Sequence, residues 1–259
     1  MKIADKVFEN YTFVMAIVNL TPDSFWKESR TAEDGVLFAV ERAIKEGASV
    51  IDLGAQSTRP GYTEVSAEEE IKRLERPLRL IKERFDIPVS VDTYFSECAK
   101  VALSLGADMI NDIWGLSRDG KMAEVIAKSN ASVCIMHNAK TPLLGDIWHP
   151  IEDFLRKSVK KAEENGIDKD RIILDGGIGF AKSKEQNLEL LEGYERLSGL
   201  GYPLLLGTSR KSLFGGKVED RLPQTLASTR LAVQKNVLFV RVHDVKENVE
   251  VIRREYERS

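Results

Sequence analysis

The sequence has little of what disulfide-stabilised, membrane-spanning and nucleic-acid-binding proteins need. Its two cysteines, Cys98 and Cys134, have no C-x-x-C spacing, so we expect two buried, reduced thiols rather than a disulfide or a metal site. No run approaches the roughly 18 apolar residues of a membrane span, and the charged N-terminal segment does not resemble a signal peptide. The net charge is only -3, with both signs interspersed. We therefore expect a cytoplasmic protein that binds neither membrane nor nucleic acid.

The 259 residues instead alternate between short apolar runs and longer amphipathic stretches. The apolar runs predict strands at residues 13–18, 50–53, 89–91, 109–110, 133–136, 172–174, 204–206 and 237–240. The amphipathic stretches predict helices at residues 33–45, 66–85, 96–105, 121–128, 151–164, 184–197, 223–234 and 245–256. Eight strand–helix units of this size, with no linker between them, predict an α/β fold: a single-domain (β/α)8 TIM barrel over residues 1–259.

Helix 66–85 shows the pattern most clearly. Its apolar residues recur at spacings of three and four, and Ser66 followed three residues later by Glu69 predicts a capping box at its start. A helix that begins this firmly supports the placing of the strands on either side of it.

Polar side chains follow every predicted strand. In a (β/α)8 barrel the loops after the carboxyl ends of the strands form the active site, so these side chains should converge on one rim. They include Asn19, the run Ser57 to Gly61, Asp92, Asn111, His137, Asp175, Lys211, Arg241 and His243. Any single one could be a helix cap or a rim ion pair, and we expect Thr93, Asp112 and Asp244 to serve that way. The whole set is more than a structural rim requires.

Two chemistries can be assigned to this rim from the residues alone. Asp92, Asn111, Asp175 and Lys211 suit a flat heterocycle, because a carboxylate matches an N–H/NH2 edge and an ammonium matches a ring carbonyl. The cations Arg59, Arg241 and His243, with the hydroxyls of Ser57 and Thr58, suit a phosphate or pyrophosphate. Asn19 adds a neutral oxygen of the kind that Mg²⁺ accepts beside phosphate oxygens. The residues predict a barrel enzyme for a polar heterocycle and an anionic group.

Seven short segments, each at a predicted strand end, resemble the dihydropteroate synthase family. They are residues 19–25 (NLTPDSF), 57–61 (STRPG), 90–93 (SVDT), 110–113 (INDI), 177–180 (GIGF), 209–212 (SRKS) and 241–245 (RVHDV). They occur in that family's order and span nearly the whole chain. The resemblance implies that 6-hydroxymethyl-7,8-dihydropterin pyrophosphate condenses with para-aminobenzoate to give 7,8-dihydropteroate and pyrophosphate.

The resemblance also implies a role for each matching residue. The pterin contacts would be Asp92, Asn111, Met136, Asp175, Lys211 and Arg241. The pyrophosphate contacts would be Asn19 (through Mg²⁺), Thr58, Arg59, Arg241 and His243, and the para-aminobenzoate contacts Pro60, Phe180 and Ser212. Catalysis would rest on Asn19, Arg59, Lys211, Arg241 and His243. A homodimer is what the family suggests.

The sequence departs from the family pattern in the first loop and at a few single positions. Trp26-Lys27-Glu28-Ser29 stands where the family usually has Ser-Asp-Gly-Gly, and Ala181 stands where it has Gly. Gln56 replaces a common Glu, and Gly176 a Pro. These changes leave open a paralogue: a methyltetrahydrofolate-dependent methyltransferase-like barrel or a non-catalytic pterin-binding subunit. A zinc hydrolase built on His137 and His243 is a further alternative, but the sequence has no close ligand pair.

Overall fold

A computed structural model of the protein describes residues 1–20, 32–56 and 64–258. Eight parallel strands close into a barrel, with the last strand beside the first. The strands are β3 (Phe13–Asn19), β4 (Val50–Gly54), β5 (Val89–Asp92), β6 (Met109–Asp112), β7 (Ser132–Met136), β8 (Ile172–Asp175), β9 (Leu204–Leu206) and β10 (Phe239–Val242). The predicted (β/α)8 barrel is confirmed.

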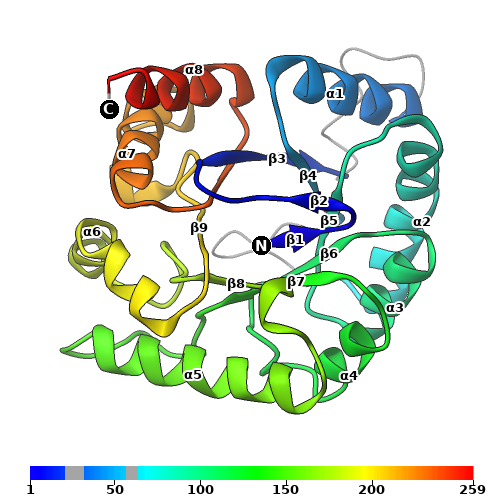
Figure 1. Cartoon of the computed structure of the whole chain (residues 1–259), viewed down its shortest axis with the longest axis horizontal. Coiled ribbons are helices and arrows are strands. Elements are labelled where there is room, and N and C mark those ends of the chain that lie inside the picture. The colour runs from blue at the N-terminus through cyan, green and yellow to red at the C-terminus, as the bar shows by residue number, and fades with distance from the viewer. Residues whose placement is uncertain (21–31, 57–63, 259) are drawn as a thin grey trace.

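The helices form a ring outside the strands, in chain order (Figure 1). They are α1 (Ala32–Glu46), α2 (Ala67–Arg84), α3 (Ser96–Ser104), α4 (Met122–Ala127), α5 (Trp148–Glu164), α6 (Lys184–Glu192), α7 (Leu222–Gln234) and α8 (Val245–Tyr256). One face of each strand packs on this ring and forms the largest apolar cluster of the molecule. None of the described helices is long and apolar enough to cross a membrane.

A short hairpin that the sequence did not predict closes one end of the barrel. Strands β1 (Lys2–Ile3) and β2 (Lys6–Val7) pair antiparallel and lie across the barrel interior in the view of Figure 1. Ile3 and Phe8 pack there against inward-facing apolar residues of the barrel strands, such as Met15 and Phe239. Strands of two residues are too short to leave a periodic pattern, which is why the hairpin was missed. The substrate side of the barrel is therefore the opposite end.

Two boundaries differ from the prediction for reasons visible in the packing. Helix α6 ends at Glu192 rather than at 197, and a 3-10 segment, η3 (Tyr194–Leu200), follows it. Gly193 separates the two where a Cβ would lie 2.6 Å from the ring of Trp148, so only glycine fits between these elements. Strand β10 begins two residues later than predicted because its register pairs Phe239 with Phe13.

The start of α2 is capped, although not by the predicted box. The hydroxyl of Ser66 accepts a hydrogen bond from the Glu69 backbone N–H at 3.2 Å, while the Glu69 carboxylate accepts from Arg73 at 2.8 Å. A complete capping box occurs instead at Ser183 and Gln186, at the start of α6. Cys98 and Cys134 are both buried and free, as predicted.

Candidate active site

The candidate site is a polar layer placed directly above the apolar floor of the barrel. Successive side chains of a strand point to opposite faces, so the residue two positions after a floor residue also faces inward. Val50, Met109, Ile173 and Phe239 belong to the floor cluster. Two residues further along each strand come Asp52, Asn111, Asp175 and Arg241, and Asp92 stands at the equivalent inward position of β5. The barrel thus gathers charged groups from widely separated parts of the chain.

Arg241 is the centre of this layer. Its Nε donates to Oδ2 of Asp52 at 2.6 Å, and its Nη2 donates to Oδ2 of Asp92 at 2.6 Å. Burial opposes the charge of the guanidinium, but the two carboxylates outweigh it and raise the pKa of Arg241 overall. Burial raises the pKa of Asp92 to about 7, with Arg241 opposing the rise and Asp52 adding to it. Arg241 therefore lies within the last strand and inside the barrel, not on the loop after it as predicted.

Asp175 is held from the other side of the layer by its own loop and by η3. Its Oδ1 accepts from the backbone N–H of Gly177 at 2.7 Å and lies 3.0 Å from the hydroxyl of Tyr194. That hydroxyl also accepts from the Gly176 N–H at 2.9 Å and lies 2.5 Å from the carbonyl oxygen of Leu205. Burial raises the pKa of Asp175, while Lys211 lowers it. Asp175 is thus fixed in direction before any ligand arrives.

Lys211 and Phe180 lie together beside Asp175. The Lys211 ammonium donates to the carbonyl oxygen of Ile178 and sits 4.7 Å from the centre of the Phe180 ring. Burial lowers the pKa of Lys211 to about 8, with Asp175 opposing the fall. Met136 packs nearby with Tyr94 and Ile113 in an apolar cluster to which Phe180 also contributes. Of the predicted para-aminobenzoate contacts, Phe180 therefore lines this region and Ser212 is exposed at its edge, at the start of a short 3-10 turn.

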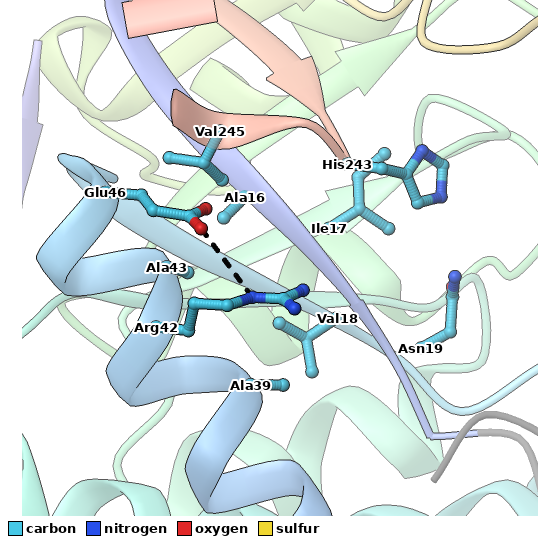
Figure 2. Close-up of a pocket in the computed structure, with 10 residues that line it drawn as sticks. All are labelled: Ala16, Ile17, Val18, Asn19, Ala39, Arg42, Ala43, Glu46, His243 and Val245. Carbon is cyan, nitrogen blue, oxygen red and sulfur yellow. Dashed lines mark ion pairs between the residues drawn. The ribbon is translucent and has the colours of Figure 1, made fainter. Parts of the chain in front are cut away.

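Asn19 and His243 meet at a separate pocket of about 150 Å³ between β3 and α1. Figure 2 shows both side chains on one side of β3, with Arg42 and Glu46 of α1 on the other. The Nδ1 of His243 lies 2.9 Å from the hydroxyl of Ser209, in the loop after β9. Arg241 contacts the carboxylates of the polar layer, and His243 contacts Ser209. That Arg241 and His243 act together on an anion stays a prediction, and His243 and Asn19 line the same pocket.

The described residues around Asn19 suit a metal ion that takes few ligands from the protein. Among the described residues, no group of three or more His, Cys, Asp or Glu side chains could hold one. Asn19, the last residue of β3, brings a neutral carboxamide oxygen to this pocket. Mg²⁺ commonly takes one or two protein oxygens and completes its shell with water and substrate phosphate. Asn19 fits that arrangement.

Several predicted residues lie outside the described part of the chain. They are Thr58, Arg59 and Pro60 of the second loop, together with Ser57, and the unusual Lys27 and Glu28 of the first loop.

The residues expected to be structural are so. Asp112 accepts from the backbone N–H groups of Trp114 and Leu116, both at 2.8 Å, and Thr93 accepts from that of Phe95 at 3.2 Å. Asp244 forms a rim ion pair with Arg210 through two hydrogen bonds. His137 lies in no metal-binding group of three or more His, Cys, Asp or Glu side chains among the described residues, and its Nδ1 lies 2.9 Å from the ammonium of Lys182.

Sequence reasoning missed three residues of the site: Asp52, Tyr194 and Lys182. Asp52 is inside a strand rather than after it, but a lone acid at the same inward parity as the floor residue Val50 was a usable signal. Lys182 donates to the carbonyl oxygens of Gly177 and Phe180, both at 3.0 Å, and so ties the loop after β8 together. Neither Tyr194 nor Lys182 has a spacing that could have indicated its role.

Known proteins resemble this chain in family, sequence and structure. The family model described as "Pterin binding enzyme" matches residues 15–243. A dihydropteroate synthase of Clostridium beijerinckii is 46% identical over 256 residues, covering 96% of this chain and 95% of its own. Among solved structures, the dihydropteroate synthase of Clostridium difficile, determined in the presence of pteroic acid, superposes with a TM-score of 0.93 at 42% identity, covering 96% of this chain and 97% of its own. The Xanthomonas albilineans dihydropteroate synthase with 4-aminobenzoic acid gives a TM-score of 0.91 at 36% identity, covering 96% and 93%.

Proposed function

Because the chain belongs to the dihydropteroate synthase family of pterin-binding enzymes, we propose that its polar layer binds the pterin and that Asn19 and His243 receive the pyrophosphate. The reaction is the condensation of 6-hydroxymethyl-7,8-dihydropterin pyrophosphate with para-aminobenzoate, which gives 7,8-dihydropteroate and pyrophosphate. The observation that carries the proposal is the set of inward-facing acceptors on separate strands, which suit the N–H edge of a pterin.

The proposal that the polar layer binds the pterin is supported by a buried oxygen that lacks a hydrogen-bond donor. We call Asp92, Asn111, Met136, Asp175, Lys211 and Arg241 the pterin half of the site. Within the described chain, Oδ1 of Asp92 is buried and has no partner, although Oδ2 is bound by Arg241. A buried carboxylate oxygen without a donor is costly, and a bound N–H/NH2 edge would supply one. Lys211 stands beside Asp175 as the donor for a ring carbonyl, and Met136 and Arg241 would pack on the ring.

The anion half consists of His243, Asn19 and, from the second loop, Thr58 and Arg59. Their positive and neutral donors suit the pyrophosphate of the substrate. Mg²⁺ bound by Asn19 and by phosphate oxygens would neutralise negative charge on this group, the contribution such an ion makes in phosphoryl chemistry. Since the described residues offer few other ligands near Asn19, we expect substrate phosphate oxygens to complete the coordination of the ion.

The chemistry requires no covalent enzyme nucleophile. As pyrophosphate departs with the electrons of the C–O bond, the pterin methylene carbon becomes strongly cationic. The lone pair of the neutral arylamine forms the C–N bond to this carbon, and the nitrogen then loses a proton to the departing pyrophosphate or to water. Asp92 and Asp175 hold the pterin through its N–H groups and favour positive charge on the ring, while the cations of the site favour the departing anion. Phe180, Pro60 and Ser212 would position para-aminobenzoate, with the Lys211 ammonium on the Phe180 ring fixing one wall. We further propose a cytoplasmic homodimer, as the family suggests.

One assay tests the reaction directly. Pyrophosphate release from the pterin pyrophosphate should be slow alone and should rise steeply when para-aminobenzoate is added. The two halves are then separated by variants: Asp175→Asn should weaken binding of a pterin without a pyrophosphate group, and His243→Ala should leave that binding intact while weakening pyrophosphate. Release that is indifferent to para-aminobenzoate would contradict the assignment.

A further inference from the structure

Asp52 is a buried carboxylate that the proposed reaction does not use directly. It lies in the middle of β4 and none of its surface is exposed. Acids are almost never buried to this extent unless they are paired, because an unpaired buried charge is very costly. Its neighbours in the strand, Ile51 and Leu53, belong to the apolar cluster on the outer face of the barrel. The carboxylate therefore points inward, into the polar layer that holds Arg241 and Asn111.

Two groups of the pterin half converge on a single oxygen of this carboxylate. Oδ2 of Asp52 accepts from Nε of Arg241 at 2.6 Å and from Nδ2 of Asn111 at 3.4 Å. The contact through Nε, together with that of Nη2 to Asp92, holds the guanidinium at two points and so fixes its plane. The contact to Asn111 fixes the sense of its carboxamide: the NH2 group faces Asp52, which leaves the oxygen to accept from a ligand.

We propose that Asp52 is the positioning residue of the pterin half, setting both the plane of Arg241 and the donor–acceptor sense of Asn111. The inference rests on the proposed pterin site. Asp52 acts through Arg241 and Asn111, the two residues of the proposed pterin site that it binds. Replacing a buried ion pair by apolar residues is often neutral or stabilising, so stability alone does not explain a charge at this position.

The charge of Asp52 also acts on Asp92. Two carboxylates share the guanidinium of Arg241, and hydrogen bonds donated by a ligand would help to stabilise their negative charge. The charged groups that act on Asp92 come from five elements: Arg241 of β10, Asp52 of β4, Glu70 of α2, Asp112 of β6 and Lys211 after β9. Asp52 is one of the groups that raise the pKa of Asp92. Removing its charge should make Asp92 ionise at lower pH.

The test compares Asp52→Asn with Asp108→Asn. Asp108 is also a partly buried acid in an ion pair, accepting from Lys82 at 2.7 Å and from the Val89 N–H at 2.8 Å, but it precedes β6 and so lies at the opposite end of the barrel. Binding of 6-hydroxymethyl-7,8-dihydropterin is measured by calorimetry from pH 5 to 9, together with the KM for para-aminobenzoate. For Asp52→Asn we expect pterin affinity to fall at least tenfold, the acidic limb of the binding profile to move to lower pH, and the KM to stay within about twofold. Asp108→Asn should leave pterin affinity and its pH profile unchanged.

Two results would overturn the role proposed for Asp52. Wild-type affinity and an unmoved acidic limb in Asp52→Asn would overturn it, and so would an equal loss in Asp108→Asn, because both variants would then report general destabilisation. If Asp52→Asn does not fold, the smaller Asp52→Ser is measured against the same expectations. If the wild-type protein itself does not bind the dihydropterin, the proposed function fails and not merely the role of Asp52.

Discussion

Among the tyrosine hydroxyls with a described contact, that of Tyr194 should contribute most to the free energy of unfolding. Tyr194→Phe removes one buried oxygen and keeps the aromatic ring. Tyr194 is fully buried. Three groups lose a partner: the Gly176 N–H, the Leu205 carbonyl oxygen and Oδ1 of Asp175. A buried donor left unsatisfied costs about 1–3 kcal/mol, and a hydrogen bond to a charged group is worth about 1.5–3 kcal/mol. Since the contacts share one oxygen, we expect a loss of about 2–4 kcal/mol in the free energy of unfolding.

Urea denaturation of Tyr194→Phe beside Tyr202→Phe measures this loss. The Tyr202 hydroxyl donates to Glu163 at 2.6 Å on the surface, so its removal should change the free energy of unfolding by no more than about 0.5 kcal/mol. Tyr194→Phe should also weaken binding of the dihydropterin, because Asp175 loses one of the contacts that fix its direction. Equal midpoints for the two variants would refute the reasoning.

Three further outcomes are expected. Burial raises the pKa of Asp92 to about 7, so its ionised, hydrogen-bond-accepting form is lost as pH falls through that value, and the pterin affinity measured by calorimetry should drop below about pH 7. The same raised pKa means that Asp92 contributes stability at low pH that disappears as pH rises towards 7. Asp92→Asn should abolish this dependence of the free energy of unfolding on pH, measured by urea titration. Ala181 has φ +49°, a left-handed conformation that costs a non-glycine residue about 1 kcal/mol, so Ala181→Gly should raise the free energy of unfolding by about that amount, and a lowered urea midpoint would contradict this. Lys182→Met removes the ammonium that binds the carbonyl oxygens of Gly177 and Phe180, so steady-state kinetics should show the KM for para-aminobenzoate rising about tenfold, or about 1.4 kcal/mol, with pterin affinity unchanged.

The strand–helix alternation predicted the barrel because each strand must bury one face under a helix and so carries a run of apolar residues. Where a strand continues beyond its apolar run, the sequence predicted the end of the strand less well. Arg241 was placed after the last strand because the apolar run ends at Val240, yet the register with β3 carries the strand on to Val242. Register depends on the partner strand, which a local pattern does not contain.

The candidate site could be predicted as far as residue types at strand ends indicate it. Asp92, Asn111 and Asp175 were found this way, and the barrel brings them to one layer. Tyr194 and Lys182 could not be found, because each acts by contacting the loop after β8 from a position that only the tertiary fold determines. A pattern of spacing reports which residues share an element, but it does not report which elements meet.

The barrel cannot close during synthesis until its last strand, β10, has been made. Strand β10 pairs residues 239–242 with residues 13–16, so the first strand has an open edge until the end of the chain has been made. At translation rates of about 5–20 residues per second, that interval lasts roughly 10–45 s. Until β10 is made, Asp52 and Asp92 lack Arg241, and the unpaired edges of β3 and, once it has been made, of β9 can pair with other chains. Chaperone demand in the cell should therefore peak on nascent chains that have completed β9 but not yet released β10.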